Sequence, residues 1–165
     1  MTIVLIGAPG AGKTAVGERL AALLGMPFVD VDQRIAQVIG KPVAEIFADE
    51  GEEYFRQLEE SASLELLETD GVLALGGGAV LNPRIRQALA GHDVIWLEVS
   101  APVAARRMGL NTARPLLLGN IRGQLIEQLR ERTPFYRELA GARVEVDGTS
   151  VEDIAAELAA TRRTA

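Results

Sequence analysis

One segment near the amino terminus has the residue types and the spacing needed to bind phosphate. Residues 7–14 read G-A-P-G-A-G-K-T and fit the pattern G-x-x-x-x-G-K-T, after an apolar run and before a helical pattern. Glycines let successive backbone N–H groups turn toward an anion, and the helix amino terminus adds the positive end of its dipole. Lys13 can then reach the β- and γ-phosphates, and the Thr14 hydroxyl can bind Mg²⁺. The pattern favours a nucleoside triphosphate site over a turn that only caps a helix, and it leaves the phosphoryl acceptor open.

Asp30 and Asp32 are the nearest acidic side chains that could complete a magnesium site. They lie at the end of a short apolar segment at 27–30. The alternation of an extended chain would place both carboxylates on one side, at the carboxyl end of a strand, where α/β proteins bind ligands. One carboxylate could hold magnesium through water while the other accepts a proton from an attacking hydroxyl. The alternative for Asp32 is structural: it would cap a helix that begins at Gln33.

Short apolar runs that alternate with helical patterns must position these groups. The runs are 3–6, 27–30, 72–75, 94–97 and 143–146. Unbroken apolar strands separated by helices are typical of a parallel sheet buried on both faces, and right-handed crossovers then give a doubly wound domain. We therefore expect an α/β fold with three layers around five parallel strands, in one domain over residues 1–165.

Two segments do not fit a simple alternation of strand and helix. Residues 32–70 are mostly helical, with breaks at Pro42 and Gly51, and offer room for a small helical subdomain. Residues 109–121 are punctuated by Gly, Asn and Pro. An irregular loop of that length inside a compact domain is often a functional lid, so we expect a lid there.

Composition excludes several classes of protein. The 165 residues carry 17 basic and 23 acidic side chains, a net charge of −6, which gives no general attraction to nucleic acid or to an anionic membrane. Without cysteine and with one histidine, the chain has no disulfide, thiolate zinc site or multi-histidine metal site. No apolar stretch approaches the roughly 20 residues of a membrane span, and the first residues lack a signal-peptide pattern, so we expect a cytoplasmic protein.

The motifs taken together resemble the shikimate kinase family. The matching segments keep the family's order over about residues 2 to 140, and they are Gly7–Thr14, Phe28–Asp32, Ile46–Glu59, Gly76–Gly78 and Asn111–Leu117. The F-R-x-x-E and triple-glycine elements are more diagnostic than the phosphate loop, which many nucleotide enzymes share. The resemblance implies transfer of the γ-phosphoryl group of ATP to the 3-hydroxyl of shikimate, in the pathway to chorismate and aromatic amino acids. It also implies an adenylate-kinase-like fold with a helical substrate-binding region and a mobile lid.

The resemblance assigns a set of residues to shikimate. Two arginines would bind its carboxylate, a glutamate would orient one of them, two phenylalanines would form the apolar side of the pocket, and an aspartate and three glycines would face the ring. These residues are Asp32, Phe47, Phe55, Arg56, Glu59, Gly76, Gly77, Gly78 and Arg132.

Each of these residues also has an ordinary structural interpretation. Arg56 lies on a helix expected from about Glu52 to Leu67, where Glu52 and Glu59 could pair with it on the surface. The phenylalanines could be core residues, the glycines could form a tight turn with positive φ, and Arg132 could lie on a helix surface.

The resemblance further implies that Lys13, Asp32 and Arg114 carry the catalysis. Asp32 would orient the 3-hydroxyl and act as its base, while Lys13, the lid residue Arg114 and Mg²⁺ would stabilise the transferring phosphoryl group. Thr14 and, through water, Asp30 would hold the metal. The nucleotide would be contacted by Gly10, Ala11, Gly12, Lys13, Thr14, Ala15, Arg107 and Arg114.

Other functions share the phosphate loop. A gluconate-type kinase or a nucleoside monophosphate kinase would have the same fold, and a non-catalytic nucleotide-binding regulator would keep the loop without turnover. The F-R-x-x-E and triple-glycine elements favour shikimate, and the joint presence of Lys13, Thr14, Asp32 and Arg114 favours an enzyme. We expect ATP and shikimate as partners of a monomer, with neither nucleic acid nor membrane.

Overall fold

The computed structural model describes residues 1–109 and 115–163. In the second range it describes side chains only from residue 122 onward. Its sheet has five parallel strands in the order β2-β3-β1-β4-β5. The strands are β1 (Thr2–Ile6), β2 (Phe28–Asp30), β3 (Gly71–Ala74), β4 (Asp93–Glu98) and β5 (Ala142–Glu145). The five predicted strands are therefore confirmed, each within one residue of its expected ends.

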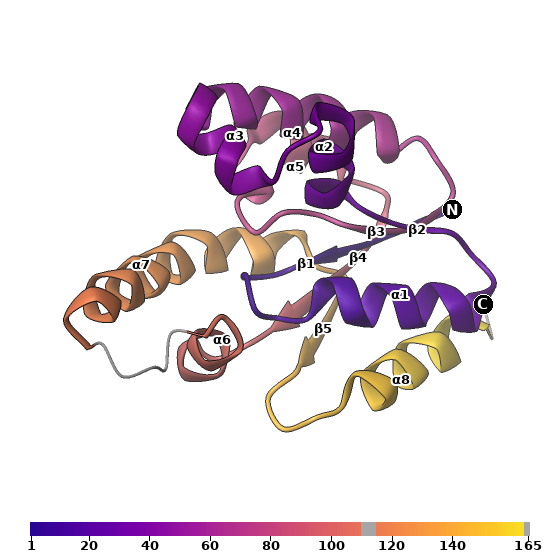
Figure 1. Ribbon diagram of the computed structural model, residues 1–165. Coiled ribbons are helices and arrows are strands. Elements are labelled where there is room, and N and C mark those ends of the chain that lie inside the picture. The colour runs from indigo at the N-terminus through magenta and orange to yellow at the C-terminus, as the bar shows by residue number, and fades with distance from the viewer. Residues whose placement is uncertain (110–114, 164–165) are drawn as a thin grey trace.

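Helices cover both faces of this sheet and make the three predicted layers (Figure 1). They are α1 (Lys13–Leu24), α2 (Val31–Ile39), α3 (Val43–Glu50), α4 (Glu52–Leu66), the 3₁₀ helix η1 (Ala79–Leu81), α5 (Pro83–Ala88), α6 (Ala101–Arg107), α7 (Pro115–Leu139) and α8 (Val151–Arg163). On one face lie α1 and α8, and on the other lie α2 to α5 and the carboxyl-terminal part of α7.

Strand β1 shows why the strands read as unbroken apolar runs. Ile3 and Leu5 belong to the core packed against α1 and α8, whereas Val4 and Ile6 belong to the core packed against α2 to α5. Successive side chains of a strand point to opposite faces, so a strand with helices on both faces needs an apolar residue at every position.

The helical region predicted at 32–70 consists of α2, α3 and α4, and begins one residue earlier than expected, at Val31. Helix α7 begins at Pro115, a favoured first helical residue because proline lacks an N–H that would be unpaired there. The segment expected to be irregular over 109–121 is thus helical in its second half.

Within the described parts of the chain, no helix is both long and apolar enough to cross a membrane.

Candidate active site

The phosphate loop connects β1 to α1 at the carboxyl end of the sheet (Figure 1). Gly10 and Gly12 have φ of 83° and 89°, which favour glycine, and a Cβ on Gly10 would lie 3.0 Å from the Ala104 carbonyl oxygen. Lys13 Nζ donates to the carbonyl oxygens of Gly7 and Ala8 at 2.7 and 3.0 Å. Burial lowers the pKa of Lys13 to about 8 although Asp32 and Asp30 oppose the effect. The lysine therefore lies inside the loop, next to two carboxylates.

Asp30 performs the capping role that one interpretation gave to Asp32. Its Oδ1 accepts from the backbone N–H of Gln33 at 3.1 Å, and its Oδ2 accepts from the Thr14 hydroxyl at 2.6 Å. Asp30 is the N-cap of α2, so the helix begins at Val31. Asp32 consequently lies in the first helical turn. The expected cap by Asp32 is wrong, and so is the extended alternation, although both aspartates line the same cavity, as that alternation predicted.

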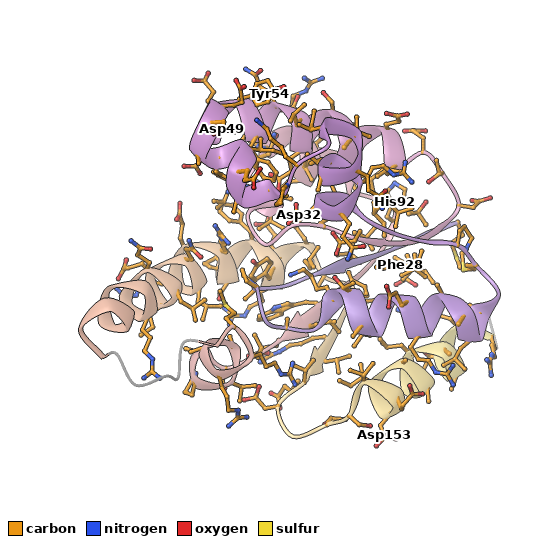
Figure 2. All side chains as sticks on the ribbon, in the orientation of Figure 1. Phe28, Asp32, Asp49, Tyr54, His92 and Asp153 are labelled. Carbon is orange, nitrogen blue, oxygen red and sulfur yellow. The ribbon has the colours of Figure 1, made fainter. Side chains whose placement is uncertain are left out.

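Asp32 is left free to face the site. It lies where the layer of α2 to α4 meets the sheet (Figure 2). Its Oδ1 is fully enclosed and has no hydrogen-bond partner among the described residues. Burial is the main reason why its pKa is raised to about 6; the charges of Glu59 and Asp30 raise it further, whereas Lys13 and Arg56 lower it. Among the described residues, no hydrogen bond of the Asp32 Oδ1 atom accounts for its burial.

Arg56 forms one exposed and one buried ion pair on α4. Its Nε lies 3.5 Å from Oε1 of the exposed Glu52, and its Nη1 donates to Oε1 of Glu59 at 2.8 Å. The Glu59 side chain is only 2% exposed, and burial raises its pKa although Arg56 opposes this. Arg56 thus pairs with Glu52 on the surface, as the ordinary structural interpretation expected. For Glu59 the expectation of a surface pair is wrong, because Glu59 is buried. The buried partner fixes the guanidinium.

Phe47 and Phe55 lie beside this guanidinium. Their ring centroids are 4.6 Å apart, and the Arg56 Cζ lies 5.9 and 5.6 Å from them. Phe55 is buried in the core, whereas Phe47 is partly exposed. Core packing and the formation of an apolar wall beside Arg56 are therefore both features of this pair.

The three glycines after β3 are required by close approach and not by φ, because none of them has positive φ. A Cβ on Gly76 would lie 2.8 Å from Glu59 Oε2 and 2.9 Å from Asp32 Oδ1. A Cβ on Gly78 would lie 2.7 Å from Arg56 Nη2. The interpretation as a positive-φ turn is thus wrong, and the loop is the surface on which the predicted acidic and basic groups converge.

Arg132 is brought to the same loop from α7. It is 8% exposed, so the interpretation as a helix-surface arginine is wrong. Its Nη1 would lie 3.2 Å from a Cβ on Gly77, and its Nε has no hydrogen-bond partner within the described residues. Tyr136, to which the sequence analysis gave no role, donates from its hydroxyl to the Gly77 carbonyl at 2.6 Å. Its place one turn after Arg132 is the signal that could have identified it.

Arg107 lies beside the phosphate loop, where its Nη1 donates to the Gly10 carbonyl at 3.1 Å. Arg114 lies outside the described residues.

A cavity of about 510 Å³ opens between the phosphate loop and the glycine loop. Its lining consists of Pro9, Gly10, Gly12, Lys13, Thr14, Ala15, Asp30, Asp32, Gln33, Leu75, Gly76 and Gly77. The groups predicted to bind phosphate and those predicted to bind the acceptor thus face one space.

This arrangement matches a known family. A sequence model of shikimate kinases matches residues 9–162. The chain belongs to the shikimate kinase family. The expected resemblance is confirmed, and so are the fold class and the assignment to ATP-dependent kinases. These matches do not support the alternatives of a gluconate-type or nucleoside monophosphate kinase.

Relatives and solved structures of shikimate kinases cover nearly the whole chain. A shikimate kinase of Salinispora tropica is 52% identical over 158 residues, 95% of each chain. A shikimate kinase of Mycobacterium avium is 50% identical over 164 residues, which are 96% of this chain and 93% of the relative. The structure of the Acinetobacter baumannii shikimate kinase in complex with shikimate is 35% identical, with a TM-score of 0.90 over 99% of this chain and 93% of that one.

The donor set at the phosphate loop fits a magnesium ion that arrives with the nucleotide. No group of three or more His, Asp or Glu side chains in the described residues could hold a metal alone. The Thr14 hydroxyl and the Asp30 carboxylate are oxygen donors 2.6 Å apart beside the loop. Mg²⁺ commonly takes one or two protein oxygens, several waters and phosphate oxygens, so these two groups suffice.

Proposed function

We propose that this chain transfers the γ-phosphoryl group of ATP to the 3-hydroxyl of shikimate, giving shikimate 3-phosphate in the pathway to chorismate and aromatic amino acids. The observation that carries the proposal is the convergence of Asp32, Arg56 and Glu59 on Gly76 and Gly78, next to the phosphate loop. A small acceptor with one carboxylate and several hydroxyls needs that combination of fixed guanidinium, carboxylate and close backbone.

Arg56 and Arg132 bind the carboxylate of the acceptor. Glu59 holds the Arg56 guanidinium at 2.8 Å, and the rings of Phe47 and Phe55 restrict it from the side. A guanidinium held in this way loses little conformational entropy on binding a carboxylate. Gly76, Gly77 and Gly78 let the acceptor approach the backbone.

Asp32 accepts the proton of the attacking hydroxyl. The 3-hydroxyl oxygen forms a bond to the γ-phosphorus, the bond between that phosphorus and the oxygen of ADP breaks, and the hydroxyl proton passes to the Asp32 carboxylate. A base is most effective when its pKa is close to the working pH without exceeding it. The pKa of about 6 meets this condition near neutral pH.

The remaining groups bind the nucleotide. The backbone of residues 10–15 surrounds the phosphates, Arg107 stacks on adenine, and Lys13 and Arg114 stabilise the charge of the transferring phosphoryl group. Thr14 and, through water, Asp30 would hold Mg²⁺, which would neutralise charge on the phosphates. Residues 110–114 of the predicted lid lie outside the described residues; the role proposed for the lid is to exclude water from the site.

The proposal includes a monomer in the cytoplasm. Support comes from one chain that supplies both the phosphate loop and the acceptor groups. Sedimentation of the purified protein tests the oligomeric state, and fractionation of the producing cells tests the location. The net charge of −6 supports the absence of nucleic acid and membrane among its partners.

Release of ADP from MgATP tests the proposal, with shikimate, gluconate and AMP supplied separately. We expect release that depends on shikimate alone and is lost in Asp32→Asn. Tyr54→Phe, a change on the outer side of α4 away from the sheet (Figure 2), is the control that should leave the rate unchanged. ATP binding without release for any acceptor would overturn the proposal.

A further inference from the structure

A single phenol hydroxyl connects the glycine loop to the helix that carries Arg132. Tyr136 is 1% exposed and donates from Oη to the Gly77 carbonyl at 2.6 Å. A hydroxyl has one proton, so this donation leaves its lone pairs as acceptors for another group. The Arg132 guanidinium, one turn earlier on α7, interacts with that oxygen.

The hydroxyl keeps its proton under working conditions. Burial raises the pKa of Tyr136 to about 12, although the adjacent Arg132 guanidinium acts in the opposite direction. The phenol is therefore a neutral link, with a donor for the loop carbonyl and an acceptor for the arginine. The Nε of Arg132 has no hydrogen-bond partner among the described residues, so this nitrogen offers no competing anchor for the guanidinium.

A second link ties the same stretch of α7 to the segment after the glycines. Arg86 on α5 donates from Nη1 to the Val80 carbonyl at 2.8 Å, and its guanidinium carbon lies 4.3 Å from the centroid of the Phe135 ring. Two successive residues of α7 are therefore fixed to residues 77–80. Rotation of α7 about its axis, which would move Arg132, would have to break both links.

We propose that Tyr136 is a positioning residue for shikimate, whose hydroxyl sets the place of the Arg132 guanidinium relative to the Gly77 backbone. This inference rests on the proposed function, in which Arg132 binds the carboxylate of the acceptor. Tyr136 itself does not contact the acceptor. It acts on the affinity for shikimate through Arg132.

Tyr136→Phe tests the inference, with Tyr54→Phe as the matched control on the only other tyrosine. We expect the KM for shikimate to rise about tenfold in Tyr136→Phe, the size expected for a hydrogen bond to a charged group. The KM for ATP should stay within about twofold, and Tyr54→Phe should change neither. An unchanged KM for shikimate, with or without a loss of stability, would overturn the inference.

A double-mutant cycle shows whether the effect passes through Arg132. In an Arg132→Ala background, Tyr136→Phe should raise the KM for shikimate no further, because the group that Tyr136 positions is gone. Independent, multiplicative effects of the two changes would contradict the proposed route.

A measurement of shikimate binding without ATP turnover separates this inference from the proposed function. With 3-fluorotyrosine at both tyrosines, ¹⁹F NMR gives one signal from the buried residue and one from the exposed residue. Shikimate added without ATP should shift the Tyr136 signal in the wild type and not in Arg132→Ala. Shikimate that saturates without moving the Tyr136 signal overturns the inference. Failure of the proposed function would appear instead as ATP turnover that does not depend on shikimate.

Discussion

Replacing Asp32 by asparagine should stabilise the ligand-free protein while it removes activity. The carboxylate is partly buried, near Glu59 and Asp30, and its pKa is raised from 3.8 to about 6. A raised carboxyl pKa means that folding disfavours the charged form. The cost is absent while the group is protonated in both states; it appears as pH rises above 3.8 and is complete above about pH 6. Asparagine has nearly the same shape and no charge, so it avoids this cost.

The size of the effect follows from the two pKa values. A group that titrates near 6 when folded and at 3.8 when unfolded destabilises the fold by about 1 kcal/mol at pH 4.5 and about 3 kcal/mol at pH 8. The folded-state pKa of about 6 already includes the attraction of Lys13 and Arg56 for the carboxylate. The loss of that attraction in Asp32→Asn therefore needs no separate correction. The gain from Asp32→Asn should therefore grow with pH, from about 1 to about 3 kcal/mol.

Urea unfolding of both proteins without ATP or shikimate, at pH 4.5 and pH 8, measures this difference. Asp153→Asn is the control. It removes an exposed carboxylate in the first turn of α8, far from the site (Figure 2), and should destabilise slightly through the helix dipole. If Asp32→Asn were no more stable than the wild type at pH 8, the account of Asp32 as a disfavoured charge would be refuted.

Three further predictions concern the same elements. Arg56→Ala should raise the KM for shikimate by about 10- to 100-fold with little change for ATP, because charge-assisted hydrogen bonds are lost; equal effects on both substrates would argue against it. The value of kcat/KM should fall below about pH 6 as Asp32 takes up its proton, and a profile flat to pH 5 would exclude it as the base. Gly17→Ala should destabilise, since its Cβ would lie 2.3 Å from the Phe28 ring, whereas Gly123→Ala, with open space, should stabilise by about 0.5–1 kcal/mol in urea unfolding.

The sheet could be predicted from the sequence because both of its faces are covered. Ile3 to Ile6 read as an unbroken apolar run, and the structure divides them between two cores. Since burial on both faces removes the usual alternation, such a strand is recognised by its apolar length and its flanking glycines. The strand ends differ by at most one residue, which is the precision that hydrogen-bond patterns allow.

The local geometry of the two aspartates could not be predicted in the same way. Either residue is a good N-cap, and a change of two residues in the helix start exchanges their roles. The choice falls on Asp30 because its carboxylate also accepts from the Thr14 hydroxyl across the loop. That contact joins residues 16 positions apart in the chain, and no local pattern records it.

The site residues on helices show the same limit. Arg56, Glu59 and Arg132 follow ordinary helical spacing, which does not distinguish an exposed ion pair from a buried one. The glycine loop distinguishes the buried side chains from exposed ones. Glu59, Arg56 and Arg132 occupy the space that Cβ atoms on the three glycines would need. The resemblance to the family predicted roles for these residues, since a family pattern carries three-dimensional contacts that composition and periodicity do not.

Lys13 and Asp32 are both held in the charged form that burial disfavours. Enclosure lowers the pKa of Lys13 to about 8 and raises the pKa of Asp32 to about 6, and each group partly offsets the other. Lys13 donates to the Gly7 and Ala8 carbonyls, whereas Asp32 Oδ1 has no hydrogen-bond partner among the described residues. In the proposed function, phosphate oxygens approach the lysine, and the acceptor hydroxyl supplies the partner that Asp32 lacks. In that proposal, the charge on Asp32 both destabilises the ligand-free fold and serves as the base of the reaction, so a change that removes the charge should stabilise the protein and abolish activity.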